Sequence, residues 1–591
     1  MWNESFPMRD SRAEPLPRRF GRGAAALALS LLIAAPAAAQ IGRPIPLIAP
    51  PPPQKAAPAT PPSLPAPPPP AAAAGSDIET QPLAPVDSSW LGTLGEANGG
   101  LPRNMWEGTA RALVAAALPQ LAPTSSPVLQ DLARRLLLSD AESPQGQDPP
   151  DRPSLAALRL DRLLALGIVA EALPLLDALP DSAASDSLDR TRVELRFAAN
   201  DVAGACRTVQ QRIDRYPEVW WARALVACQA LTGDRAAALL GLSVLAEQKA
   251  PSDPVFDSLV ETLAGRPHKI DKLPQPTPLR LALLAAAKLP LPPDALAEAG
   301  PAALYGYATN ETVPAERRLA AAERAALLGA LPPEALGKLY LAIGFKPDEQ
   351  TAAFAEGKLP DVPHTRAILY ATARSSADAR IRAAALAELL TDAKKRGAFL
   401  ATARLVAPVL VELLPEDADS GFAGDAARAL LATGHADAAE RWLAAADASE
   451  LRLVAHLAAP SANPGDAAAL LNDSIAALAS RDSSGAQARA ALLLTLASAF
   501  EPVGVLDWRP LLAPPHQAML PDAALWLDQR DAADARRVGE TALASLLLAQ
   551  AGGALTGEPI VLARVIAGLQ AIGLGTEARA LAVEAALAAG I

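Results

Sequence analysis

Three short stretches decide the fold. Residues 167–172 read Gly-Ile-Val-Ala-Glu-Ala, residues 200–205 read Asn-Asp-Val-Ala-Gly-Ala, and residues 233–238 read Gly-Asp-Arg-Ala-Ala-Ala. Each begins with Gly or Asn, which tolerate the left-handed backbone conformation that ends many helices. Each ends with Ala, whose small side chain lets a second helix pack closely against the first. Because the stretches start 33 residues apart, twice in succession, they predict a repeated helix–turn–helix unit.

The same pattern extends beyond these stretches. Four residues after each Ala stands a large apolar residue, which lies on the same face of a helix. These residues are Leu176, Val209 and Leu242. A further copy follows at Gly434, Ala439 and Leu443, and a looser one at Gly573, Ala578 and Leu581, where Leu comes three residues after Ala.

This layout resembles the tetratricopeptide (TPR) repeat, a helix–turn–helix unit of about 34 residues. Pro217 stands where that repeat closes a unit with proline. The first-helix aromatic and Leu-Gly positions of the family are not reproduced, since the second unit has Asp189, Arg192 and Arg196 in that helix. The resemblance implies a TPR-like α-solenoid of stacked helix pairs, so we expect TPR-like helical repeats.

Composition also favours an all-α protein. The chain has 591 residues, is 51% apolar and only 4% aromatic. Its core must therefore consist mainly of Ala, Leu and Val, of which the first two are strong helix formers. We find no alternating pattern that predicts a strand of useful length.

The N-terminal region predicts export. The basic stretch 18–22 precedes an apolar run at 24–35, and Ala37-Ala38-Ala39 offers a cleavage site. Residues 1–39 therefore read as a cleaved signal peptide, and the mature protein as periplasmic. Arg18-Arg19 suggests twin-arginine export, but the following residues fit the general secretory route better. An uncleaved segment would instead tether the protein to the membrane.

A proline-rich tract follows the signal peptide. Residues 44–85 contain sixteen prolines, which lack amide donors and prevent regular helices or central strands. We therefore expect residues 40–88 to be a disordered Pro/Ala-rich linker. Residues 89–265 are expected to form an N-terminal helical region with TPR-like repeats, and residues 266–591 a C-terminal helical-repeat region.

The two cysteines, Cys206 and Cys228, are predicted to form a disulfide. They fall on the second helix of one unit and the first helix of the next, which are neighbours in a solenoid. An exported protein also meets oxidising conditions. The alternative is two buried, unpaired thiols that pack as small hydrophobes.

Several function classes have no support in the sequence. The formal net charge of −11, without a basic stripe, argues against nucleic-acid binding. The five histidines are isolated in sequence, and no metal-ligand, phosphate-loop or nucleophile motif is present. We therefore predict no enzyme activity, no cofactor and no metal.

Two function classes stay open. The first is a scaffold that binds other envelope proteins, because stacked helix pairs form an extended concave surface. If the TPR-like register holds, its partner groove includes five first-helix residues: Asp161, Arg190, Glu194, Trp220 and Arg223. The alternative for Trp220 and Trp221 is core packing. The second class is an envelope enzyme or peptidoglycan binder whose site forms only in three dimensions.

A broader resemblance supports the envelope location. The segment from Cys206 to Cys228 around Trp220-Trp221, together with residues 274–279 (Pro-Gln-Pro-Thr-Pro-Leu), resembles exported helical proteins of high-GC bacteria. This resemblance implies an exported helical protein and assigns no activity.

Overall fold

The structure is a computed structural model that describes residues 87–591, except 88, 150–151, 181–183, 348, 350–361, 447–448, 461–465, 480–483, 507–508, 512–520, 554 and 556. The predicted signal peptide (1–39) and nearly all of the predicted linker (40–88) lie outside the described residues. The part of the chain from Ala84 to Ile591 forms one compact unit.

The described residues are helical, with no β-strand beyond two isolated bridges. This confirms the all-α prediction. The first half contains α1 (Arg111–Ala117), α2 (Pro127–Leu138), α3 (Leu155–Leu166), α4 (Val169–Ala178), α5 (Asp186–Ala198), α6 (Val202–Arg212), α7 (Val219–Leu231), α8 (Arg235–Glu247), α9 (Pro254–Leu263), α10 (Pro278–Ala286), α11 (Pro293–Glu298), α12 (Pro301–Thr309) and α13 (Ala315–Leu327). The second half contains α14 (Pro333–Leu341), α16 (Pro363–Ser375), α17 (Ala379–Lys395), α18 (Phe399–Leu410), α19 (Ala423–Ala432), α20 (Ala436–Leu443), α21 (Ser449–Ala458), α22 (Asp466–Ala479), α23 (Ser484–Ser498), α24 (Ala523–Asp534), α25 (Val538–Ala551), α26 (Pro559–Ala571) and α27 (Gly575–Ala588).

The turn residues identified in the sequence have the expected conformation. The backbone φ angle is +76° at Gly167, +61° at Asn200 and +84° at Gly233. It is also positive at Gly434 (+76°) and Gly573 (+84°). In all five cases the next helix begins two residues later. The Gly or Asn residues at these five positions therefore predicted correctly where five helices end.

The Ala positions of the pattern lie at the centre of the helix contacts. The five alanines are completely buried: Ala172, Ala205, Ala238, Ala439 and Ala578. The two helices that flank each turn pack against each other, as in α5 with α6 and α7 with α8. A side chain larger than Ala would separate them, so these positions fix how close the paired helices approach.

Helices after residue 265 return to the first repeats. α10 packs against α5 and α7, and α12 packs against α3 and α5. α10 and α12 also pack against each other, and α13 packs against α12. The N-terminal repeats therefore share their core with helices from the next part of the chain.

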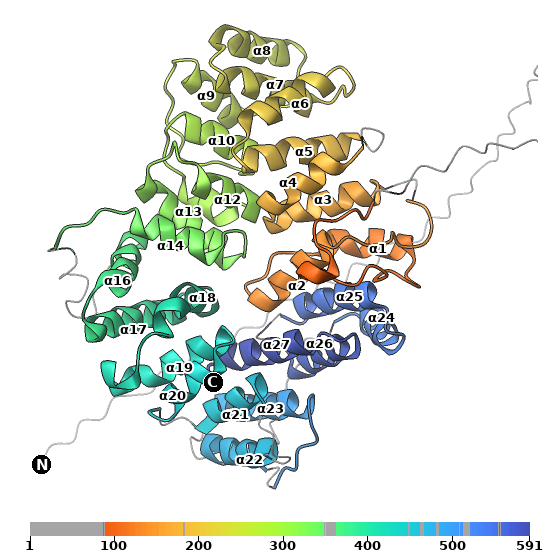
Figure 1. Cartoon of the computed structure of the whole chain (residues 1–591). Helices are drawn as coiled ribbons and strands as arrows, with labels where there is room; N and C mark the ends of the chain where they lie inside the picture. The colour runs from red at the N-terminus through yellow and green to blue at the C-terminus, as the bar shows by residue number, and fades with distance from the viewer. Residues whose placement is uncertain are drawn as a thin grey trace, which may run out of the picture. The chain divides into compact units, whose positions relative to one another are not determined.

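The two ends of the described chain meet. α2 packs against α25 and α27, and α27 also contacts α19 and α21. Figure 1 shows the blue C-terminal helices beside the orange helices α1 and α2. Gly539, at the start of α25, donates its amide to the carbonyl of Met105 at 2.7 Å. A methyl group added at Gly539 would lie 2.7 Å from the Trp106 ring, so glycine permits this close approach.

None of the described helices combines the length and apolar character that a membrane crossing requires.

Candidate functional site

Arg190 and Trp220, two of the predicted groove residues, lie together. The Arg190 guanidinium stands 5.4 Å from the Trp220 ring centroid, in a cation–π contact. Arg190 also pairs with Asp186 at 2.9 Å and approaches Glu218 at 3.8 Å. Trp220 packs edge-on against Trp221, with 4.9 Å between ring centroids. This pair of helices, α5 and α7, therefore presents an aromatic side chain flanked by charges.

The two adjacent tryptophans have different environments. Trp221 is completely buried and donates its Nε1–H to Asp186 at 2.7 Å, whereas Trp220 is only partly buried. Core packing is therefore correct for Trp221. Trp220 remains partly open to solvent.

The other three predicted groove residues, Asp161, Glu194 and Arg223, each have a partner outside this Arg190–Trp220 contact. The Glu194 carboxylate accepts the Leu279 amide at 3.0 Å, at the beginning of α10. Arg223 donates to the carbonyl of Pro251. Asp161 lies on α3, one helix pair before α5, and pairs with the adjacent Arg162 at 2.5 Å. α10 packs on α5 and Glu194 accepts an amide from it, so the structure places Glu194 in a helix contact, apart from Arg190 and Trp220.

Polar residues of α5, which the sequence singled out, form a buried network with α6 and the segment after it. Asp189 is completely buried and accepts a hydrogen bond from the Tyr216 hydroxyl at 2.9 Å. Arg192 and Arg212 lie 3.5 and 3.3 Å from its carboxylate. Burial, followed by the hydrogen bond to Asp189, raises the pKa of Tyr216 to about 12. This network joins α5, α6 and the segment that leads to α7.

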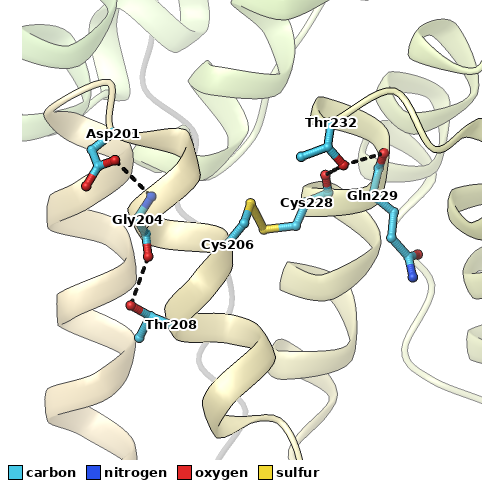
Figure 2. The surroundings of a disulfide bond; sticks show 7 residues. All are labelled: Asp201, Gly204, Cys206, Thr208, Cys228, Gln229 and Thr232. Carbon is cyan, nitrogen blue, oxygen red and sulfur yellow. Dashed lines mark hydrogen bonds between the residues drawn. A yellow bond between two sulfur atoms is a disulfide. The ribbon is translucent and has the colours of Figure 1, made fainter.

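Cys206 and Cys228 form a disulfide in the structure, as Figure 2 shows. Their Cα atoms are 5.5 Å apart, and the two side chains are 5% and 2% exposed. The bond joins α6 to α7, which belong to successive repeat units. It therefore fixes the boundary between two units.

Local hydrogen bonds stabilise the start of α6, near the Cys206 end of the disulfide. The Gly204 amide donates to the Asp201 carboxylate at 2.8 Å, and the Thr208 hydroxyl donates to the Gly204 carbonyl at 3.0 Å (Figure 2). Asp201 is the N-cap of α6, so its side chain satisfies an amide that has no partner within the helix.

A cavity of about 410 Å³ lies where early, middle and late helices meet. Its walls come from α2, the start of α4, Tyr305 of α12, the loop between α13 and α14, Arg404 of α18, and α25. Gly167 is required here for a second reason. A methyl group at this position would lie 2.5 Å from Cβ of Ala330 and 2.7 Å from Cβ of Pro301.

Charged residues line one wall of this cavity. Arg134 of α2 binds Glu171 of α4 through two parallel contacts, of 2.9 Å from Nε and 2.6 Å from Nη2. Gln130 joins the same wall to α13, because its amide donates to the Leu327 carbonyl at 3.1 Å. Leu546 and Gln550 of α25 also line the cavity. An apolar cavity with a few oriented polar groups suits binding of a side chain or a small ligand.

Sequence reasoning missed this cavity. Glu171 belongs to the first repeat stretch, but its partner Arg134 is 37 positions earlier and in no repeat unit. Gln550 and Ala122, which exchange two hydrogen bonds of 2.8 and 3.3 Å, are 428 positions apart. No local pattern links residues at such separations.

Three of the histidines in the described part of the chain each contact a different residue. His456 is nearly buried and contacts Glu501 at 2.8 Å, while the partly exposed His268 contacts Glu261 at 2.7 Å. His435 lies in a turn, with its ring 3.0 Å from the Thr433 hydroxyl. Among the described residues, no group of three or more His, Cys, Asp and Glu side chains has metal-site geometry.

Comparisons of this chain with protein-family models, curated proteins and solved structures found no match.

Proposed function

We propose that this protein is an exported, periplasmic TPR-like α-solenoid that acts as a scaffold for other proteins of the cell envelope. One observation carries the proposal: five helix–turn–helix units share a left-handed turn residue, a helix start two residues later and a fully buried Ala. Stacked units of this kind provide large surfaces for protein binding.

The disulfide supports the exported location. Both sulfur atoms are buried, in a bond with ordinary Cα separation. Such structural disulfides persist in oxidising compartments and are rare in the bacterial cytosol.

The best-supported partner surface is the region around Trp220, which we define as Arg190, Glu218, Trp220 and Arg223. Trp and Arg dominate the energetics of many protein interfaces. All four side chains are partly exposed to solvent. A partner segment with both apolar and acidic groups would complement this surface.

Photocrosslinking in intact cells tests the proposal. A photoreactive residue at position 223 is expected to capture a defined envelope protein, whereas the same residue at the exposed position 235 of α8 serves as the matched control. Arg190→Glu should weaken capture from position 223 without unfolding the chain, because Arg190 is only partly buried.

Two results would contradict the proposal. The first is retention of the full-length chain in the cytosol with both cysteines reduced. The second is turnover of peptidoglycan by the purified protein with no partner captured at position 223, which would favour the enzyme alternative.

A further inference from the structure

Two helices of this chain begin in the same way. α2 starts at Ser126-Pro127-Val128, and α10 starts at Thr277-Pro278-Leu279. In both, the hydroxyl of the N-cap residue accepts the amide of the third helical residue, at 3.2 Å in α2 and 3.4 Å in α10. Proline has no amide to donate. The amide of the second helical residue is therefore the one that still requires an acceptor.

In both helices, a glutamate from a distant helix supplies this acceptor. Glu584 of α27 accepts the Val128 amide at 3.1 Å, and it also binds the Ser126 hydroxyl. Glu194 of α5 accepts the Leu279 amide at 3.0 Å. The first contact joins residues 456 positions apart, and the second joins residues 85 positions apart. A glutamate that accepts the amide of the second helical residue thus joins α2 to α27 and α10 to α5.

Both carboxyl groups have a pKa above the ordinary value of a glutamate. Glu584 is only 2% exposed, and burial raises its pKa to about 7 despite its hydrogen bonds to Ser126 and Val128 and the charge of Arg404. Burial likewise raises the pKa of Glu194 to about 7, against the effects of Leu279, Thr277 and Arg280.

Most other charged groups on the helices around α27 have partners other than Glu584. On the helices that pack against α27, Arg135 of α2 pairs with Glu577, Arg428 of α19 donates to the Ile591 carbonyl, His456 of α21 contacts Glu501, and Arg564 of α26 donates to Gln529. Arg134 of α2 pairs with Asp131 and Glu171, and Asp425 of α19 pairs with Lys394 and Arg428. The other charged residues of these helices are Glu450 and Arg452 of α21 and Arg489 of α23. Arg404 of α18 is the charged group that acts on the Glu584 carboxyl.

We propose that Glu584 is a proton-dependent latch that joins the two ends of the helical array. When the carboxyl is protonated, its O–H donates to the Ser126 hydroxyl oxygen and its second oxygen accepts the Val128 amide. When the proton leaves, both hydrogen bonds can persist, but a negative charge then lies in a buried position. The contact between α2 and α27 therefore loosens as the pH rises through neutrality.

Hydrogen exchange at the first turn of α2 tests this latch in the intact chain. The amides of Val128 and Leu129 are followed at pH 6 and pH 8, after correction for the intrinsic pH dependence of exchange. A carboxyl with a pKa near 7 in the closed state and near 4.5 in the open state predicts about tenfold weaker protection at pH 8.

Glu584→Gln tests whether the proton of Glu584 causes the pH dependence. The Gln side chain still offers its oxygen as an acceptor to the Val128 amide and its NH2 group as a donor to the Ser126 hydroxyl, but it does not titrate. We expect equal protection at both pH values. Two control variants should keep the pH-dependent protection of the Val128 amide that the wild type shows. Glu577→Gln changes another carboxyl group at the same interface, and Glu194→Gln changes the equivalent glutamate at the start of α10. These controls separate Glu584 from His456, which is unchanged in all three variants.

Equal protection at both pH values in the wild type would overturn the proposal. So would a tenfold loss that persists in Glu584→Gln. The wild-type comparison decides the question even if Glu584→Gln does not fold.

Discussion

The repeat run α3–α8 and the junction of α2 with α25 and α27 are held together in different ways. In the repeat run, paired helices are close in sequence and meet at buried alanines, such as Ala172 and Ala205. At the junction, the contacting residues are more than 400 positions apart, and polar groups such as Glu584 are buried between the helices. Small apolar residues suffice where the chain itself brings helices together. Where it does not, specific hydrogen bonds define the contact.

The largest loss of stability is expected on replacing Asp189, a buried carboxylate in the repeat run, where most helix contacts are apolar. Asp189→Ala leaves Arg192 and Arg212 without this carboxylate in a buried region and should lower the free energy of unfolding by about 3–5 kcal/mol. Denaturant unfolding measures the change. Asp271→Ala is the control, since its side chain is 69% exposed and its loss should cost at most about 0.5 kcal/mol. Similar losses for both variants would contradict a structural role for the buried network.

The junction should respond to pH, whereas the alanine contacts should not. Because the pKa of Glu584 is about 7 in the folded chain and its ordinary value is 4.5, the unfolded chain loses its proton first as the pH rises. The contribution of Glu584 to the free energy of unfolding should therefore fall between pH 4.5 and pH 7, by about 3 kcal/mol in total. Glu584→Gln should remove this component from a pH series of unfolding curves, and an unchanged pH series would argue against it.

The disulfide makes the link between α6 and α7 stronger than packing alone. Replacing both Cys206 and Cys228 by Ala should lower stability by about 3 kcal/mol, since the bond closes a loop of 22 residues. Differential scanning calorimetry of the variant, and of the wild type with and without reductant, measures this effect. If the wild type is as stable with reductant as without it, the packing of α6 against α7 is sufficient without the disulfide.

An alanine of the repeat should not tolerate a larger side chain. Ala205→Leu places extra methyl groups at a completely buried contact of α6 and should cost about 1–3 kcal/mol. Ala236→Leu on the exposed face of α8 is the matched control. The distinction between the two regions would weaken if both variants were equally stable in thermal unfolding.

The smallest effect concerns the turn between α24 and α25. Arg536 has a φ angle of +55° where the repeat turns have Gly or Asn. Arg536→Gly should raise stability by about 0.5–1 kcal/mol, because glycine adopts this conformation without steric cost. Arg536→Ala provides the control for the lost side chain and should bring no such gain in the midpoint of thermal unfolding.

The sequence predicted the repeat run because its determinants are local. Gly167, Asn200 and Gly233 mark their turns by residue type alone, and the 33-residue period places Ala172, Ala205 and Ala238. Arg536 was missed because an arginine carries no signal for a left-handed turn. In physical terms, the turn is imposed there by the packing of the helices on either side.

The candidate sites were predicted less completely. The pairing of Cys206 with Cys228 follows from neighbouring helices, and the structure has this bond. Glu194 was placed in an open groove because the repeat pattern gives no information about α10, which returns to α5. The Glu584 contact with Ser126 joins residues 458 positions apart, so no periodicity within the sequence could indicate it.

The junction of the two chain ends is tested most directly by crosslinking within the folded monomer. Arg135 and Glu577 form an ion pair across it, so Arg135→Cys and Glu577→Cys introduced together should be joined by a short bismaleimide. The expected result is one intramolecular product at low protein concentration, identified by mass spectrometry of the linked peptides. A matched pair, Arg135→Cys with Ser243→Cys on the exposed face of α8, should remain unlinked. Failure of the first pair to crosslink in the natively folded protein would contradict the closure of α2 onto α27.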